Sequence, residues 1–134
     1  MSQENVETVG RVLRRYGRQD LEGMLKDIHA EVEIDYSDSN APDASVYRGH
    51  AACRAFVQSR YEDFDERSFD ATELIDAPPN AVIALGRMRG RGRASGVAVE
   101  AYSVTFWTLC DGKVSRIKLY QTRAGALKDA GLRE

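Results

Sequence analysis

The segment from Val97 to Gln121 constrains the fold more than any other part of the chain. It reads VAVEAYSVTFWTLCDGKVSRIKLYQ, two runs rich in β-branched and aromatic residues that meet at Asp111 and Gly112. Such residues are typical of strands. Asp-Gly between two such runs indicates a tight turn, because glycine adopts a positive φ without steric cost. The sequence therefore predicts a long antiparallel hairpin.

The length of the turn decides which residues pair across this hairpin. If only residues 111–112 form the loop, Trp107 pairs with Arg116; if residues 110–112 form it, Trp107 pairs with Ser115. A slip of one residue turns every side chain toward the opposite face of the sheet. We favour the three-residue loop because it sorts the side chains into two more distinct faces.

In the favoured register the two faces of the hairpin differ in size and polarity. One face carries mostly small or apolar residues: Ala101, Ser103, Thr105, Trp107, Ile117 and Leu119. The other face carries amphipathic residues: Tyr102, Val104, Phe106, Arg116, Lys118 and Tyr120. A face of small residues with one large aromatic side chain fits either the wall of a pocket or an ordinary packed core.

Composition predicts one globular domain spanning residues 1–134. The chain has 134 residues, of which 43% are hydrophobic and 30% charged, and its formal net charge is -2. The weak negative charge argues against nucleic acid as a partner. Cys53 and Cys110 show no metal-ligand or disulfide spacing. Because no segment resembles a signal peptide or a membrane span, we expect a cytoplasmic protein that contacts no membrane.

The first half of the chain alternates between helical and strand patterns. Residues 3–16 have apolar side chains at helical spacing, and Asp20 is placed to cap a short second helix. Residues 31–37 alternate as a half-buried strand does. A polar loop at 38–49 then leads to a third helix at 49–64, whose apolar stripe indicates core packing.

The second half of the chain is dominated by strands. Strand patterns at 69–76 and 81–89 precede the hairpin, and a short helix at 123–130 follows it and ends at Gly131. Helices followed by a run of antiparallel strands predict an α+β fold. We expect one curved sheet whose concave side is covered by helices, with a cavity between the two layers.

Two sets of charged residues have a functional and a structural interpretation. Arginines of one parity form a basic stripe: Arg87, Arg89, Arg91 and Arg93. The stripe fits an anion site, but a solvated strand face is favoured because no stacking aromatic residues lie between the arginines. His29 and His50 are the only side chains expected to titrate near neutral pH. A surface or capping role is favoured for both over a place at the mouth of a pocket.

Four segments carry a resemblance to a known family: SQENVETVGRVLRRYGRQDLEGML, AEVEIDY, YRGHAACRAFV and FWTLCDGKVSRIKLY. In this order they resemble the SnoaL-like branch of the NTF2-like superfamily, over nearly the whole chain. The resemblance implies an NTF2-like cone, a curved antiparallel sheet with helices over its concave face. The superfamily includes polyketide cyclases, ketosteroid isomerases and epoxide hydrolases, so the resemblance implies a pocket without naming one activity.

The catalytic groups of these relatives do not match this sequence. Ketosteroid-isomerase-like members place an oxyanion-holding tyrosine on the first helix, a general-base aspartate near the end of the first strand and a neutral aspartate on the hairpin. The matching positions here are Val12, Tyr36 and Thr105. A threonine hydroxyl donates a hydrogen bond but does not titrate near neutral pH. The Asp-Arg-Asp relay of the epoxide hydrolases has no clear counterpart either.

The resemblance and the hairpin face together define a candidate ligand pocket. Its expected lining is Tyr16, Tyr36, Tyr61, Met88, Ser103, Thr105, Trp107 and Leu119. Aromatic walls with a few hydroxyls suit a mostly apolar compound that carries one or two oxygens. We expect either an isomerase, cyclase or hydrolase that acts on such a compound, or a non-catalytic binding or interaction module. We expect no metal and no cofactor.

The resemblance also implies a homodimer. In this family the open face of the sheet commonly pairs two copies. Tyr102, Phe106 and Tyr120 would supply such a surface here, since exposed apolar patches usually mark interfaces.

Overall fold

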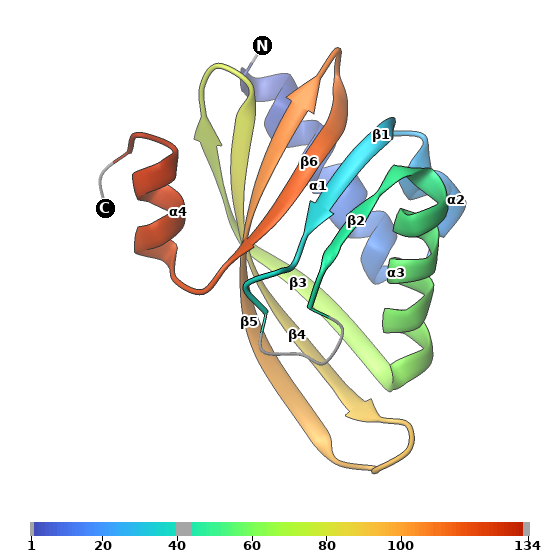
Figure 1. The fold of residues 1–134 in the computed structure, drawn as a ribbon. Helices are drawn as coiled ribbons and strands as arrows, with labels where there is room; N and C mark the ends of the chain where they lie inside the picture. Colours follow the sequence, from blue (N-terminus) through green and yellow to red (C-terminus); the bar gives the residue numbers. More distant parts are fainter. Residues whose placement is uncertain (1, 40–43, 133–134) are drawn as a thin grey trace.

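The computed structural model describes residues 2–39 and 44–132, which form four helices and six strands (Figure 1). In chain order these are α1 (Ser2–Gly17), α2 (Leu21–Leu25), β1 (Ile28–Asp35), β2 (Val46–Arg48), α3 (Gly49–Asp63), β3 (Phe64–Ala77), β4 (Ala81–Gly92), β5 (Ala98–Cys110), β6 (Lys113–Tyr120) and α4 (Arg123–Asp129). The α+β prediction is confirmed. The polar loop predicted at 38–49 contains β2, and its residues 40–43 lie outside the described residues.

The six strands form one sheet in the order β2-β1-β6-β5-β4-β3. Each neighbouring pair is antiparallel except β1 and β6, which run parallel. The predicted antiparallel sheet is therefore mostly, but not wholly, antiparallel. The parallel pair arises because the chain returns to β1 only after the whole β3–β6 meander, and a crossover of that length permits a parallel partner.

The hairpin has the shorter of the two predicted loops. Asp111 and Gly112 both have positive φ, 53° and 77°, as a two-residue turn between twisted strands requires. Cys110 therefore pairs with Lys113, and the three-residue loop that we favoured is wrong. The reason is that Asp111 itself adopts the left-handed conformation, which aspartate tolerates better than most residues.

A β-bulge then corrects the direction of the side chains. Ser115 is an extra residue on β6, so the pairing shifts and Trp107 lies opposite Ile117, with Thr105 opposite Leu119. Beyond the bulge the individual pairs differ from both predicted registers. The composition of the two faces nevertheless agrees with the prediction, because the bulge restores the parity that the short turn alone would reverse.

Helices α1, α2 and α3 pack against one face of the sheet, where most of the core lies (Figure 1). The apolar stripe of α1 buries Val9 and Val12 completely. Asp20 caps α2 by accepting the backbone N–H of Gly23 at 3.0 Å. Asp27, just before β1, accepts hydrogen bonds from two arginines of α1, and these bonds tie the helix to the sheet.

Helix α4 covers part of the opposite face. Ala126 and Leu127 are buried against Ile83, whose side chain points away from the main core. Phe106 and Tyr120, two residues of the predicted dimer surface, pack against this second cluster and are half-buried. The third, Tyr102, is 74% exposed. The chain's own helix therefore occupies part of the face predicted to pair two copies, and the homodimer stays a prediction.

Candidate functional site

A cavity of about 190 Å³ lies between the main core face of the sheet and helices α1 to α3. Helices α1, α2 and α3 and every strand except β2 contribute to its walls, and apolar or aromatic side chains dominate them. The lining residues are Leu13, Tyr16, Met24, Ile28, Ile34, Tyr36, Cys53, Phe56, Val57, Arg60, Phe64, Arg67, Phe69, Met88, Ala101, Ser103, Thr105, Trp107 and Ile117.

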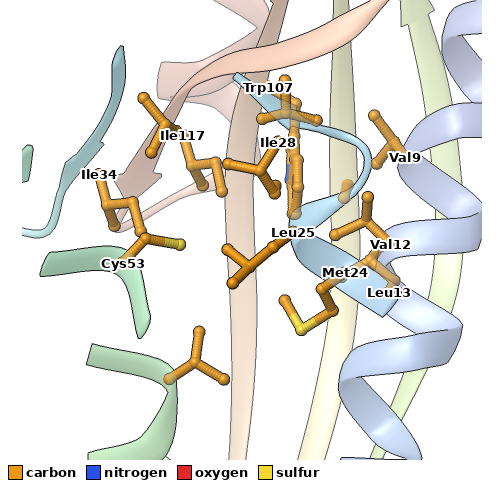
Figure 2. Close-up of a cluster of buried hydrophobic side chains, with 14 of the residues drawn as sticks. Val9, Val12, Leu13, Met24, Leu25, Ile28, Ile34, Cys53, Trp107 and Ile117 are labelled. Carbon is orange, nitrogen blue, oxygen red and sulfur yellow. The ribbon is translucent and has the colours of Figure 1, made fainter. Parts of the chain in front are cut away.

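Trp107 is the largest side chain in the wall formed by β5, and it is only 5% exposed. In Figure 2 it lies between the α1 residues Val9 and Val12 on one side and Ile34 and Cys53 on the other. Its side-chain position is fixed by a hydrogen bond, because the indole Nε1–H donates to Thr105 Oγ1 at 2.7 Å.

The hydroxyl of Thr105 is engaged on both sides. It accepts the indole N–H of Trp107 and donates to the carbonyl oxygen of Ala84 at 3.4 Å, and the residue is 6% exposed. This is the position at which the resemblance placed a neutral, proton-donating aspartate. Here the side chain serves the packing of Trp107, and its one proton is already directed at the backbone.

A cluster of aromatic rings forms the wall near the end of α1. The ring centroid of Tyr16 lies 5.7 Å from that of Tyr61 and 5.6 Å from that of Phe69, the latter edge-on. Such edge-on pairs are the favoured geometry for aromatic rings. Gly86 leaves room for the Phe69 ring, since a Cβ there would lie 2.4 Å from the ring's Cζ.

Two guanidinium groups also line the cavity. Arg67 lies over the ring of Tyr16, 4.3 Å from its centroid, and donates a hydrogen bond through Nη2 to the Tyr16 hydroxyl. Arg60 lies 4.5 Å from the ring centroid of Phe56 and 5.8 Å from that of Tyr36. Cations over aromatic faces are stabilised by the ring quadrupole. These contacts therefore help to hold both guanidinium groups in the cavity wall.

Burial sets the ionisation of the other titratable groups in the wall. It raises the pKa of the Tyr16 hydroxyl, although the charges of Arg67 and Arg60 act against this change. Burial likewise raises the pKa of the Cys53 thiol to about 11. Both groups are therefore protonated at neutral pH, and Cys53 is not a thiolate nucleophile.

The cavity wall contains no aspartate, glutamate or histidine among the described residues. His50 Nε2 lies 2.8 Å from the carbonyl oxygen of Ile28, and His29 Nδ1 accepts the backbone N–H of Glu31. Neither histidine lines the cavity. Within residues 2–39 and 44–132, no group of three or more histidine, cysteine, aspartate or glutamate side chains is placed to hold a metal ion.

The structure brings together six of the eight predicted site residues on one cavity: Tyr16, Tyr36, Met88, Ser103, Thr105 and Trp107. Tyr61 and Leu119 do not line it. The ring of Tyr61 packs behind Tyr16, and its hydroxyl donates to the Tyr16 carbonyl oxygen at 2.9 Å. Leu119 is half-buried near the end of β6, beyond Ile117, where the chain turns toward α4.

Sequence reasoning missed the charged residues of the wall. Arg60 falls within the helix predicted at 49–64, for which we expect core packing, whereas the structure places it in the cavity wall. Arg67 was placed in no element, because β3 begins at Phe64 rather than at residue 69. Side chains two residues apart on a strand share a face, so a strand extended backward from Phe69 places Arg67 on the same face as Phe69. This alternation is the one weak sequence signal for Arg67.

Three of the four arginines of the predicted stripe, Arg89, Arg91 and Arg93, are exposed, whereas Arg87 is half-buried. Arg89 pairs with Glu100 at 3.2 Å, and Arg93 pairs with Asp65 at 3.0 Å. Arg91 donates to the carbonyl oxygen of Gly96. These partners support the solvated-face interpretation over an anion site.

The sequence matches the family model described as "SnoaL-like domain" over residues 9–117. No curated protein matches it. In the described part of the chain, no helix has both the length and the apolar character needed to cross a bilayer.

Many solved structures share the fold. An NTF2-like protein from Burkholderia xenovorans is 26% identical, with a TM-score of 0.73 and 90% of each chain covered. TerC, co-crystallised with polyporic acid, is 19% identical with a TM-score of 0.75, covering 96% of this chain and 98% of its own. A Mycobacterium tuberculosis protein in complex with estradiol-17beta-hemisuccinate is 17% identical with a TM-score of 0.74, covering 90% and 95%.

Proposed function

Since this chain belongs to the SnoaL-like domain family of the NTF2-like superfamily, we propose that its cavity binds a small, mostly apolar compound that carries one or two oxygen atoms. The observation that carries the proposal is the cavity itself, an apolar and aromatic space with few polar groups. Such a composition is typical of sites that bury most of a small ligand's surface and use a few polar atoms to orient it.

The volume of the cavity limits the size of the ligand. A dry apolar cavity of about 150 Å³ accommodates benzene, and drug-sized ligands occupy roughly 300–1,000 Å³. At about 190 Å³ the cavity suits a compound of one or two rings. Solved proteins of the same fold hold polyporic acid and a steroid hemisuccinate, which supports an apolar ring compound as the ligand class.

The wall chemistry favours binding over turnover. Isomerases and cyclases that move a proton need a group whose pKa lies near the working pH. No carboxylate or imidazole among the described residues lines the cavity, and the hydroxyl of Thr105 is committed to Trp107 and Ala84. We therefore favour the non-catalytic binding alternative over an isomerase, cyclase or hydrolase.

The test uses Trp107, the only tryptophan of the chain, as an internal reporter. Two probes of matched shape, para-tert-butylbenzamide and para-tert-butylbenzoate, are titrated while tryptophan fluorescence is followed, and native mass spectrometry counts the bound molecules. At least one probe should bind with one molecule per chain. Failure of both to bind the wild-type protein would refute the proposal.

A matched pair of variants checks that binding occurs in the cavity. Ser103→Phe places a phenyl group in the cavity wall, whereas Tyr102→Phe places one at the exposed neighbouring position on the opposite face. Ser103→Phe should weaken binding by at least roughly tenfold, since it fills space that the ligand needs. Tyr102→Phe should leave affinity unchanged. Equal affinities for the two variants would locate the probe elsewhere.

A further inference from the structure

Arg67 is a cavity residue whose charge none of the described carboxylates balances. Its guanidinium contacts the rings of Tyr16 and Tyr61, at 4.3 Å and 5.6 Å from their centroids. Its Nε atom is buried and has no hydrogen-bond partner. None of the described carboxylates forms an ion pair with it. Buried charges are normally paired, and an unpaired buried donor calls for an explanation.

The position of this donor distinguishes it from other unsatisfied atoms. The two other buried side-chain atoms without a partner in the described chain are Asp76 Oδ1 and Arg87 Nε. Neither residue lines the cavity, whereas Arg67 does. Several arginines elsewhere have carboxylate partners, as Arg54 has in Glu22 at 2.7 Å.

Tyr16 adds a second donor beside Arg67. Its hydroxyl oxygen accepts a hydrogen bond from Arg67 Nη2, and the hydroxyl proton is not engaged in any hydrogen bond with another described residue. A hydroxyl that accepts from a cation becomes a better donor, because hydrogen bonds in a chain polarise one another. The pair thus presents a guanidinium N–H and a tyrosine O–H in the wall of one cavity. Both groups suit an oxygen that bears negative charge.

The spacing along α1 fits a ligand with one charged end. Val12 contributes to the core beside Trp107 (Figure 2), and Tyr16 lies four residues later on the same helix. Four residues of helix rise about 6 Å, comparable to the length of one substituted aromatic ring. An apolar body can therefore occupy the Trp107 region while a terminal oxygen reaches Arg67.

We propose, building on the function proposed above, that the ligand is an organic anion, an apolar ring compound whose carboxylate or similar anionic oxygen pairs with Arg67 and Tyr16. The guanidinium supplies charge and a planar set of donors that matches a carboxylate. The neighbouring guanidinium of Arg60 adds to the positive potential of the same cavity.

The two probes of matched shape test this directly in the wild-type protein. The benzoate and the benzamide differ in charge but little in size. Because hydrogen bonds to charged groups contribute about twice as much as neutral ones, the benzoate should bind roughly tenfold or more tightly. If neither probe binds, the proposed function itself fails. If both bind with equal affinity, that function stands and the anion preference is refuted.

Variants of Arg67 then assign the preference to this residue. Arg67→Gln removes the charge and should bring the two affinities to within about twofold, while Arg67→Lys keeps a cation and should retain part of the preference. Arg89→Gln is the control, because Arg89 is paired with Glu100 on the outer face. It should behave as wild type. An undiminished benzoate preference in a folded Arg67→Gln protein would overturn the assignment.

Discussion

Replacing Thr105 by valine should destabilise the protein through the indole of Trp107. The substitution keeps the side-chain shape but removes the oxygen that accepts the Trp107 Nε1–H at 2.7 Å. Both side chains are almost fully buried. A buried donor that loses its only acceptor costs about 1–3 kcal/mol. The new buried methyl group offsets part of this by about 0.8 kcal/mol, so we expect a net loss of about 1–2 kcal/mol.

A double-mutant cycle separates the hydrogen bond from the change of side chain. Trp107→Phe removes the donor, so Thr105→Val in that background strands no indole N–H. There the valine should be close to neutral. The difference between the two backgrounds is the coupling energy, which we expect at about 1–2 kcal/mol because the two side chains are in direct contact.

Guanidinium unfolding of the four proteins, followed by circular dichroism, measures this coupling without depending on the tryptophan signal. Slopes must agree among the four for the midpoints to be compared as stabilities. An equal cost of Thr105→Val in both backgrounds would refute the reasoning. It would mean that the indole finds another acceptor, such as water in the cavity.

Three further perturbations have defined outcomes. The hydrogen bond from Arg11 lowers the pKa of Asp27, so its stabilisation is complete above the unfolded-state pKa of about 3.9 and is lost as pH falls through the lowered folded value. Asp27→Asn should therefore be less stable at neutral pH and lose less stability on acidification, as urea midpoints across that range will show. Gly86→Ala should displace the Phe69 ring, because a Cβ there would lie 2.4 Å from it; thermal unfolding should show a loss of about 1–3 kcal/mol, and wild-type stability would contradict the packing described. Cys53 is buried and its pKa is raised to about 11, so its thiol should react slowly with a maleimide. Its rate in a Cys110→Ser protein should be far lower than the rate of Cys110 in a Cys53→Ser protein. A probe bound in the cavity should slow the reaction of Cys53 further.

The elements that sequence reasoning placed correctly are those with a local pattern. The helix predicted at 3–16 is α1, because its apolar residues recur at helical spacing. The cap at Asp20 is likewise local, because it depends only on the Asp20 side chain and the three residues that follow it. Alternation in the hairpin also predicts that Thr105 and Trp107 share the inner face, because side chains on a strand alternate between its two faces.

The features that sequence reasoning missed depend on residues distant in the chain. The local sequence around Ser115 does not distinguish a bulged residue from a paired one, because the bulge depends on how the whole strand fits its neighbours. The parallel pairing of β1 with β6 likewise joins two strands that are far apart in the chain. Arg67 lies in a charged segment that looks solvent-exposed, and its contact with Tyr16 spans 51 residues of sequence.

The bulge at Ser115 makes the two ends of the hairpin independent. The tip at Asp111 and Gly112 fixes the pairing only as far as the bulge, which then fixes the orientation of Thr105 and Trp107 separately. A change in the length or composition of the tip need not propagate to the cavity wall. Over evolution the tip can acquire insertions or new surface chemistry while the binding cavity is inherited intact, and in the laboratory it is the natural place to attach a label.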